Sequence, residues 1–468
     1  MTKLQRVLEY LHAHQSQAVD DLMEFLRIPS VSTEPGHALD MRHAAEWLKV
    51  RLMHAGFADA RIEETPGGHP VVRASYRADA QAQRRTVVVY GHYDVQPVDP
   101  VSAWHHPPFE PTVIDDVLYG RGAADDKGQL FLQLLAAEAW LKATGDIPVN
   151  IEFLFEGEEE IGSPHLLAYI ESHRQELAGD VAVISDTPMH APDVPAICYG
   201  IRGLAAMEVT VKGPYQDLHS GAFGGTVANP ALVLSRLLSS LQDADGRITV
   251  PGFYDDVEPV SAFDRQAIER LEFSDAQLQQ ELQVPKLWGE PGYSTLERMW
   301  LRPTLEINGI TAGYQGTGQK TIIPGQASAK ISCRLVPHQD PHKIQDHIEE
   351  WLRSQLPSTV TMDVVKHSGT TMSVTIPVDD PIMAAASAAV QDVFGVAPVL
   401  FRRGGSMAII EWFQTVLHQT PLLLGFTWPN EQFHAPNEHF HLSNFRRGAE
   451  TIARLWDYYE KAGADTSA

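Results

Sequence analysis

Cysteine is nearly absent from this 468-residue chain, and so is any long apolar run. Only Cys198 and Cys333 occur, too few for a disulfide framework and without the spacing of a metal knuckle. Both are expected to be small core residues in a protein of a reducing compartment. No run approaches the roughly 18 apolar residues of a membrane span, and charge interrupts the N-terminus before a signal-length apolar stretch develops. The sequence therefore predicts a cytoplasmic protein.

Positive charge is scarce. Lys and Arg number 36 against 60 Asp and Glu, a net charge of −24 that repels both nucleic-acid phosphates and anionic membranes. We therefore expect no nucleic-acid partner and no membrane partner. The 44% hydrophobic and 21% charged residues are typical of a globular protein. At about 150 residues per domain, the length predicts two or three domains.

Short apolar runs alternate with helical patterns in the first half of the chain. Thr86–Tyr90, Val149–Phe155 and Val181–Ile184 are strand-like, and Gln129–Lys142 has the pattern of a helix between the first two. This alternation predicts an α/β catalytic domain with a central, mostly parallel sheet and helices on both faces.

The pattern changes after Gly203. Strand-like runs at 206–211 and 327–336, with amphipathic helices at 229–241 and 342–356, indicate a separate α+β unit. An apolar run at 421–426 then resembles a strand of the first domain. We therefore predict a catalytic domain formed by residues 1–203 and 379–468, with an inserted lid or dimerisation domain at 204–378.

Polar residues follow each of the three early strands. His92 and Asp94 end the first, three consecutive glutamates from Glu158 to Glu160 follow the second, and Asp186 follows the third. A single histidine or a run of glutamates is commonly structural or solvated. The carboxyl ends of strands in an open α/β sheet form its ligand-binding crevice, however, so these side chains are expected to converge.

Two further segments add metal-binding residue types. Asp125 and Asp126 precede the helix that begins near Lys127, where Asp126 is a candidate N-cap and Asp125 a candidate ligand. The C-terminal run from His434 to His441 supplies three more imidazoles directly after the last buried strand. One of these three is enough to complete a metal centre.

Six motifs occur in the order and spacing of a known superfamily. They are His92-Tyr-Asp-Val-Gln-Pro97, Gly120-Arg-Gly122 with Asp125-Asp-Lys-Gly128, Glu159-Glu-Ile-Gly-Ser163, Ser185-Asp186, Asp217-Leu-His-Ser-Gly221 and His434-Ala-Pro-Asn-Glu438. The chain resembles, from about residue 20 to 460, the two-zinc metallopeptidases that include carnosinase-type dipeptidases, acetylornithine deacetylase, succinyl-diaminopimelate desuccinylase and glutamate carboxypeptidase. The Asp217–Gly221 motif and Tyr199-Gly-Ile-Arg-Gly203 most resemble the dipeptidase branch.

The resemblance implies a metal-ligand set. His92 and Asp186 would hold one ion, Glu160 and His434 the other, and Asp125 would bridge them. Oxygen and imidazole ligands suit Zn²⁺, and Mn²⁺ or Co²⁺ also fit. Asp94 lies two residues after His92, on the same side of an extended chain, and is a candidate partner for its other ring nitrogen; a structural salt bridge is the alternative.

The resemblance also implies that Glu159 is the general base. A carboxylate is needed to accept the proton of the attacking water and pass it to the leaving amine. The assignment of Glu159 as base and Glu160 as ligand rests on the position of Gly162-Ser163. A shift by one residue would assign Glu158 and Glu159 instead.

Four residues outside the metal motifs match substrate-binding positions of the superfamily. His219 would stabilise the oxyanion, often from the partner subunit, and Arg334 would bind the substrate's terminal carboxylate. Gly405 and Ser406 lie in a loop that would offer backbone N–H groups to the same carboxylate. The alternatives are that His219 orders its loop, that Arg334 makes a cross-strand salt bridge, and that the glycines serve a turn.

The sequence thus predicts a dinuclear metallohydrolase that cleaves the amide bond of a dipeptide or similar small substrate with a free carboxylate. It further predicts a homodimer through the inserted domain. An N-acyl-amino-acid deacylase or desuccinylase is the alternative within enzymes. A non-catalytic metal-binding homologue is the alternative from another class, and the unligated Glu159 beside five ligands argues against it.

Overall fold

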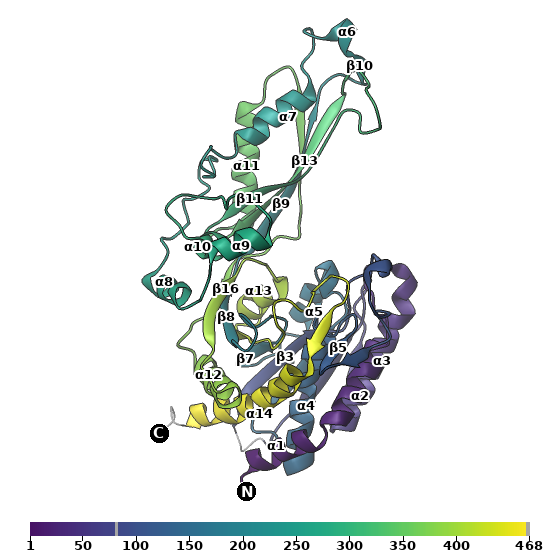
Figure 1. Ribbon diagram of the computed structural model, residues 1–468, viewed down its shortest axis with the longest axis vertical. Coiled ribbons are helices and arrows are strands. Elements are labelled where there is room, and N and C mark those ends of the chain that lie inside the picture. The colour runs from purple at the N-terminus through teal and green to yellow at the C-terminus, as the bar shows by residue number, and fades with distance from the viewer. Residues whose placement is uncertain (80–82, 465–468) are drawn as a thin grey trace. The chain divides into compact units, whose positions relative to one another are not determined.

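The computed structural model describes residues 1–79 and 83–464 and divides into two units (Figure 1). Unit 1 comprises residues 1–199, 376–401 and 412–468, and unit 2 comprises residues 200–375 and 402–411. The segment 402–411, placed by the sequence in the second catalytic part, packs with unit 2. Its contacts with Arg202 and Arg334 account for this, as described below.

A mixed sheet with a parallel centre forms the core of unit 1. Its strands follow the order β1-β2-β6-β3-β7-β17-β8-β15, where β15 is Val374–Thr375, and β16 (Val399–Arg403) also pairs with β8. Strands β6, β3, β7 and β17 run parallel, whereas β1, β2 and β8 pair antiparallel with their neighbours. The bounds are β1 Arg61–Glu63, β2 Val71–Tyr76, β3 Thr86–His92, β6 Asn150–Glu156, β7 Val181–Ile184, β8 Ala196–Ile201 and β17 Thr420–Leu423.

Helices cover both faces of this sheet, as the sequence predicts. Adjacent residues of a strand point to opposite faces. In β3, the Tyr90 ring meets the ring of Phe413 in α13 at 5.9 Å, whereas Gly91 faces Leu130 of α4. The helices of unit 1 are α1 Lys3–Ala13, α2 Gln15–Leu26, α3 Ala38–Ala55, α4 Lys127–Thr144, α5 Leu166–Ser172, α12 Pro381–Phe394, α14 Leu442–Ala464 and the end of α13 Ala408–Thr415.

A small antiparallel sheet joins distant parts of unit 1. Its order is β18-β5-β4, formed by His439–His441, Val117–Tyr119 and Thr112–Ile114. It brings the C-terminal histidine run beside the segment that leads to Asp125 and α4. Asp126 occupies the N-cap position of α4 but its side chain makes no capping hydrogen bond.

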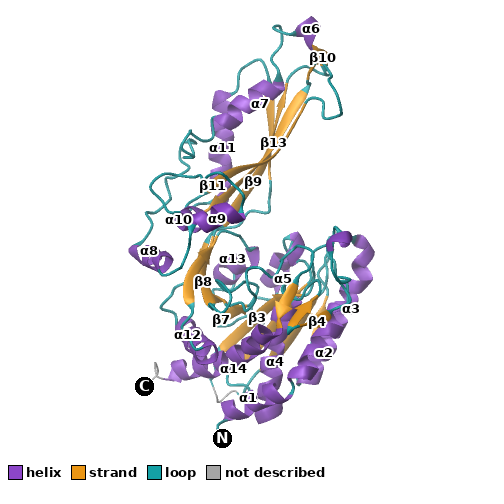
Figure 2. Cartoon of the chain, viewed as in Figure 1, coloured by secondary structure: helices purple, strands orange, loops and turns teal. Residues whose placement is uncertain are grey.

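Unit 2 is built on a separate antiparallel sheet of order β11-β13-β9-β14 (Figure 2). Alternate residues of β9 and β13 are buried against α7 and α11, and these strands and helices together form the core of unit 2. The 251–302 region holds three short helices. The bounds are β9 Gly203–Lys212, β10 Leu218–His219, β11 Thr304–Ala312, β12 Ile322–Ile323, β13 Gln326–Leu335, β14 Thr361–Lys366, α6 Ser220–Phe223, α7 Pro230–Ser239, α8 Ala262–Glu269, α9 Asp275–Glu281, α10 Thr295–Trp300 and α11 Pro341–Gln355.

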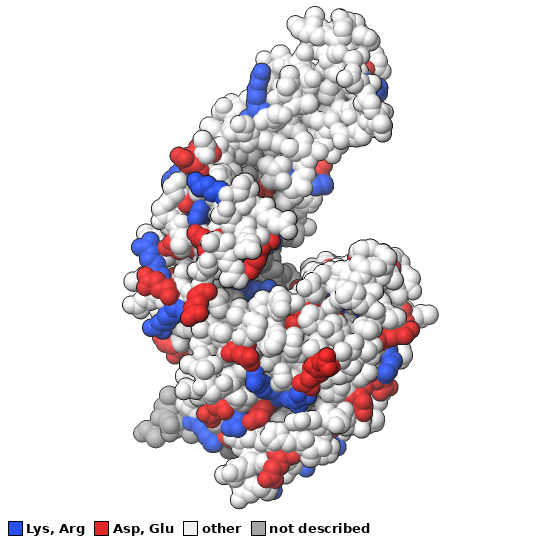
Figure 3. All heavy atoms as spheres, in the orientation of Figure 1, with Lys and Arg blue, Asp and Glu red and all other residues white. Residues whose placement is uncertain are grey.

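Acidic and basic side chains are interspersed on the face drawn in Figure 3. The end of unit 2 that carries α6 and β10 shows few of either sign on that face. Within the described residues, no helix combines the length and apolar character of a membrane span. The predicted cytoplasmic location stays a prediction.

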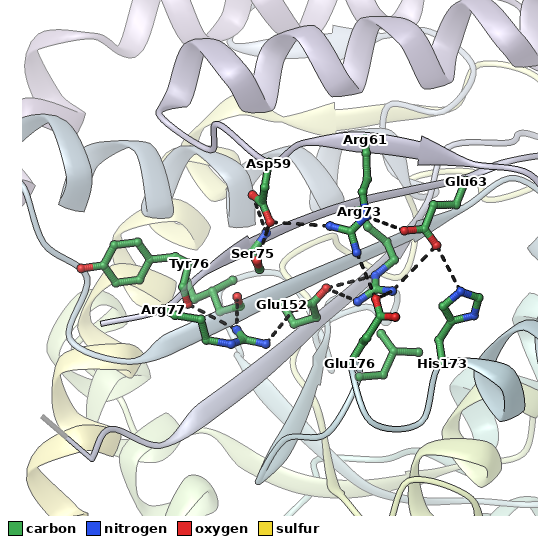
Figure 4. A network of polar contacts seen from close by, with 12 residues as sticks. Asp59, Arg61, Glu63, Arg73, Ser75, Tyr76, Arg77, Glu152, His173 and Glu176 are labelled. Atoms are coloured by element: carbon green, nitrogen blue, oxygen red, sulfur yellow. Dashed lines mark hydrogen bonds and ion pairs between the residues drawn. The ribbon is translucent and has the colours of Figure 1, made fainter. Parts of the chain in front are cut away.

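A buried ion pair joins the antiparallel edge of the unit 1 sheet to its parallel centre (Figure 4). Arg73 of β2 is 1% exposed and donates from Nε and Nη2 to Glu152 of β6 at 3.0 and 2.6 Å. Arg73 also donates to Glu176 at 2.9 Å, and Arg77 reaches the second oxygen of Glu152 at 2.9 Å. Both charges of the Arg73–Glu152 pair are therefore hydrogen-bonded, as buried charges must be.

Candidate metal centre

The predicted ligands lie at the carboxyl ends of neighbouring parallel strands. His92 ends β3, Glu159 and Glu160 lie in the short 3₁₀ turn after β6, and Asp186 follows β7. Asp125 lies immediately before the N-cap of α4, and His434 lies in the loop between β17 and β18. Because parallel strands present their carboxyl ends at one edge, residues separated by up to 342 positions meet there.

The five predicted ligands form a continuous series of contacts. Nε2 of His92 lies 3.2 Å from Oδ1 of Asp125 and 3.7 Å from Oδ2 of Asp186. Nε2 of His434 lies 2.9 Å from Oδ2 of Asp125 and 3.4 Å from Oε2 of Glu160. Asp125 thus presents one carboxylate oxygen to each imidazole, so that it would be the ligand shared by two ions.

Glu159 and Glu160 differ in their hydrogen bonding although both lie near His92. One carboxylate oxygen of Glu159, one of Asp186 and a ring nitrogen of His92 lie within 4.8 Å of one another. One oxygen of Asp125, one of Glu160 and a ring nitrogen of His92 form a second group of this kind. Gln96 donates to Oε2 of Glu160 at 2.7 Å. Among the described residues, no group donates a hydrogen bond to the Glu159 carboxylate. Glu159 therefore keeps an unpaired carboxylate beside the cluster.

Glu158 points away from the cluster. Its carboxylate accepts a hydrogen bond from the backbone N–H of His69 at 3.1 Å and lies 2.9 Å from Nδ1 of His165. Its exposure is only 4%, so these contacts fix its orientation. This placement favours the register in which Glu159 and Glu160, rather than Glu158 and Glu159, face the candidate metal centre.

Asp94 connects the His92 and Glu160 sides of the centre. Its Oδ1 lies 3.3 Å from Nδ1 of His92, and its backbone oxygen lies 3.1 Å from the same nitrogen. The carboxylate also accepts from the backbone N–H groups of Glu159 at 3.3 Å and Glu160 at 3.0 Å, and from the Ser32 hydroxyl at 2.7 Å. A carboxylate at this position orients the His92 ring and holds the glutamate turn.

Glu438 holds the Asp125 loop, a role that the sequence analysis missed. Its fully buried carboxylate accepts from the backbone N–H groups of Gly122, Ala124 and Asp125 at 2.9–3.0 Å, and from Nη1 of Arg121 at 2.7 Å. Glu438 lies four residues after His434, so it ties the His434 loop to the Asp125 loop. The sequence did offer a signal for this role, because Glu438 is the last residue of the His434–Glu438 motif.

The electrostatics of the cluster suit divalent cations. Burial, then Asp125, raises the pKa of Glu160 to about 9, and burial with the charge of Asp186 raises the pKa of Glu159. Burial opposes protonation of His92, but hydrogen bonds to Asp125 and Asp94 outweigh it and raise its pKa. Among the described residues, no Lys or Arg forms an ion pair with Asp125, Glu159 or Glu160. Apart from the exposed His434, the oxygen and imidazole donors are buried or partly buried. Such a set, in which Asp125, Glu159 and Glu160 have no compensating Lys or Arg, fits two divalent ions.

Arg334, Gly405 and Ser406 come together in unit 2. Arg334 Nη1 donates to the Ser406 hydroxyl at 2.8 Å, and Gly405 is exposed. The alternative cross-strand salt bridge is absent, because no Asp or Glu of the described chain lies within 4 Å of the Arg334 guanidinium nitrogens. His219 is also exposed, and its Nδ1 accepts from the backbone N–H groups of Gly221 at 3.0 Å and Ala222 at 3.3 Å. This leaves Nε2 of His219 as the protonated and available nitrogen.

The motifs and fold match a defined peptidase family. A model of peptidase family M20/M25/M40 matches residues 88–458. The chain belongs to this family. The predicted superfamily and fold class are therefore confirmed, and this M20 protein is a metallopeptidase.

Similar proteins cover nearly the whole chain. The M20 protein is 32% identical to the Beta-Ala-His dipeptidase of Homo sapiens over 97% of this chain and 92% of that protein. It is 31% identical to the Cys-Gly metallodipeptidase DUG1 of Candida albicans over 98% of each. The solved structure of the M20 family metallo-carboxypeptidase Sso-CP2 from Sulfolobus solfataricus matches with a TM-score of 0.85 and 31% identity, covering 95% of this chain and 99% of that chain.

Proposed function

We propose that this M20 peptidase hydrolyses the amide bond of dipeptides with a free carboxylate. The observation that carries the proposal is the placement of Asp125 between His92 and His434, with Asp186 and Glu160 on either side. The dipeptidase activities named for two relatives at 31–32% identity support the choice of substrate class.

Two divalent metal ions belong to this proposal, with Zn²⁺ preferred and Mn²⁺ or Co²⁺ as alternatives. His92 and Asp186 would hold one ion, Glu160 and His434 the other, and Asp125 both. When bound, the ions polarise the scissile carbonyl and lower the pKa of the attacking water.

The remaining chemistry falls to the protein's own side chains. Glu159, whose carboxylate receives no hydrogen bond from any described residue, accepts a proton from the attacking water and delivers it to the leaving amine. Asp94 keeps the His92 ring and the backbone of Glu159 in register for this transfer through the contacts described above. Asp94 therefore acts by positioning.

Substrate recognition is assigned to unit 2. Arg334, with Ser406 and the backbone at Gly405, would bind the substrate carboxylate, because guanidinium suits a planar anion. His219, through Nε2, would donate to the oxyanion that develops at the scissile carbonyl.

His219 and Arg334 are too far apart within one unit to serve the same dipeptide. His219 pairs with Ile322 in β12, before the start of β13, whereas Arg334 lies near the end of β13. The strand from Gln326 to Arg334 alone spans about 26 Å at about 3.3 Å per residue, whereas a dipeptide spans about 7 Å. The geometry within unit 2 thus supports a homodimer in which each copy lends His219 to the other.

Exposed apolar side chains near His219 support the same dimer. Tyr215 is 90% exposed, and Phe223 and Val227 are also exposed. They flank His219 in the sequence around β10 and α6, and the end of unit 2 that carries these two elements shows few charges on the face drawn in Figure 3. Apolar groups of this size gathered at one end of a unit are typical of a contact surface.

The proposed function is tested with a substrate panel and metal reconstitution. The metal-loaded protein is assayed with dipeptides including β-alanyl-histidine and cysteinyl-glycine, their C-terminal amides, tripeptides, and N-acetyl and N-succinyl amino acids. We expect hydrolysis of free dipeptides at the highest kcat/KM. A preference for N-acyl amino acids would instead identify a deacylase or desuccinylase.

A further inference from the structure

Two arginines of unit 2 lie close together without an acidic partner. Arg202 lies between β8 and β9, and Arg334 pairs with Leu204, two residues further along, in the β13–β9 ladder. In the part of the chain that the structure describes, no Asp or Glu oxygen lies within 4 Å of either guanidinium. By contrast, most arginines of the described residues have such a partner, and the chain carries a net charge of −24.

Ser406 connects the two residues. Its hydroxyl accepts from Arg334 Nη1 at 2.8 Å and donates to the backbone oxygen of Arg202 at 2.6 Å. The Arg202 side chain in turn holds the neighbouring loop, since its Nε donates to the backbone oxygen of Gly404 at 3.1 Å and its Nη1 to that of Arg302 at 3.2 Å. The Arg202 guanidinium is thus fixed in orientation by neutral acceptors only.

The loop shape follows from the position of this guanidinium. A Cβ on Gly404 would lie 2.7 Å from Arg202 Nη2 and 2.8 Å from the backbone oxygen of Met299. Glycine at 404 therefore allows the loop to pack directly on Arg202.

Three guanidinium nitrogens of the pair lack an acceptor. They are Nη2 of Arg202 and Nε and Nη2 of Arg334, for which the described structure contains no hydrogen-bond partner. All three remain accessible to solvent. The pair therefore offers several N–H donors to a ligand.

Placing two like charges together is unfavourable without an anion. Burial, then the positive charge of Arg334, lowers the pKa of Arg202 to about 10 although the charge of Glu306 acts in the opposite direction, and burial lowers the pKa of Arg334. An anion between the two residues would remove both costs, since it supplies the missing countercharge and acceptors. The arrangement is thus better explained by ligand binding than by stability.

We propose that Arg202 and Arg334 form one anion site, and that Arg202 is a second residue that binds the substrate's free α-carboxylate. The carboxylate lies against Nη2 of Arg202 and the free edge of Arg334, whose Nη1 is held by Ser406. This proposal rests on the proposed dipeptidase function. It adds a binding residue and an explanation for the preference for an uncapped C-terminus.

The test measures binding rather than turnover. Alanyl-glycine and alanyl-glycinamide are titrated by calorimetry into the metal-loaded protein carrying Glu159→Gln, which removes the general base. In this background Arg202→Gln, Arg334→Gln and the double variant are compared. Arg270→Gln is the matched control, because Arg270 is an exposed arginine of unit 2 and its loss changes net charge equally.

We expect Arg202→Gln to raise the Kd of alanyl-glycine at least about 10-fold and that of alanyl-glycinamide less than about 2-fold, the scale of one charge-assisted hydrogen bond. The double variant should lose less than the product of the two single losses, because both arginines bind one carboxylate. Arg270→Gln should change neither Kd.

Equal weakening of both ligands by Arg202→Gln, or no weakening, would overturn the proposal in favour of a purely structural Arg202. If Arg202→Gln fails to fold, Arg202→Lys replaces it; the lysine cannot hold the loop and donate to a ligand together, so selective loss of alanyl-glycine is again expected. Absence of dipeptide hydrolysis by the unaltered enzyme would contradict the proposed function alone, since the Kd values report on the anion site independently.

Discussion

Asp125 and Asp94 each join parts of the candidate metal centre that are distant in the sequence. Asp125 shares its two oxygens between His92 and His434, and Asp94 contacts the His92 ring while accepting from the backbone of Glu159 and Glu160. At the residue scale, then, neighbouring glutamates with different surroundings are expected to have separable duties.

Glu159→Gln is expected to leave about two metal ions per chain while lowering kcat by at least about 100-fold, the usual scale for loss of a general base. Glu160→Ala is expected to lose metal, because it removes an oxygen that lies 3.4 Å from His434. Elemental analysis of dialysed protein and steady-state kinetics measure the two effects.

Glu158→Gln serves as the matched control. Because Glu158 contacts His69 and His165 instead of the cluster, this variant should retain both metal and most of its turnover. If Glu158→Gln kept its metal but lost about 100-fold in kcat, the general base would be Glu158 and the ligand Glu159, one residue earlier than assigned.

The residues of the cluster can be identified from the sequence, but not all of their contacts can. Motif order gave His92, Asp125, Glu159, Glu160, Asp186 and His434, because residue types at strand ends can be read from periodicity and resemblance. The contacts of Asp94 with two backbone N–H groups and the inward role of Glu438 could not be predicted. They depend on loop conformations that no local pattern specifies.

At the scale of elements, Glu438 is the link between the loop that carries His434 and the loop before α4. Glu438→Gln places an amide among three backbone N–H donors and removes the countercharge of Arg121. We expect metal affinity to fall about 10- to 100-fold, as for other residues that orient ligands. Metal titration measures this, with the exposed Glu110→Gln as control; unchanged affinity would contradict the positioning role.

The Arg73–Glu152 pair governs the attachment of the antiparallel edge of the unit 1 sheet. Arg73→Met leaves Glu152 buried with only the half-exposed Arg77, and we expect a loss of about 3 kcal/mol of unfolding free energy. Arg73→Met/Glu152→Met should recover most of this loss. Urea unfolding measures both, and a double variant less stable than the single one would contradict this account.

The loss in Arg73→Met should also depend on pH. Burial already raises the pKa of Glu152 with Arg73 present, and removing Arg73 raises it further. When a carboxyl group has a higher pKa in the folded than in the unfolded state, the protein loses stability as the pH rises from the unfolded-state pKa to the folded-state pKa. The deficit is therefore expected to be larger at pH 8 than at pH 5.

Strands and helices were predicted where their period was clear, as for β3, β6, β7 and α4. The segment 402–411 was assigned to the catalytic part because it precedes the apolar run at 421–426, which resembles a strand of the first domain. Its hydrogen bonds to Arg202 and Arg334 draw it into unit 2. Such tertiary contacts override sequence neighbourhood, which is why domain boundaries were harder to predict than elements.

At the scale of the whole molecule, the proposed homodimer predicts complementation between two inactive variants. His219→Ala keeps a complete metal centre, and Glu159→Gln keeps a complete His219. Heterodimers should contain one competent site in two. After random exchange we expect up to roughly a quarter of the unaltered activity, because half the dimers are mixed.

Subunits with distinct tags allow the heterodimers to be purified and assayed directly. Mixing each variant with itself provides the control for exchange. Verified heterodimers as inactive as either parent would show that His219 does not act across the subunit interface.

The central claim is that five residues hold two catalytic divalent ions, and metal removal with reconstitution tests it most directly. Chelation is expected to abolish dipeptide hydrolysis, and activity should return in proportion to added Zn²⁺, Mn²⁺ or Co²⁺ up to about two equivalents per chain. Hydrolysis at full rate by protein shown by elemental analysis to be free of metal would contradict the account.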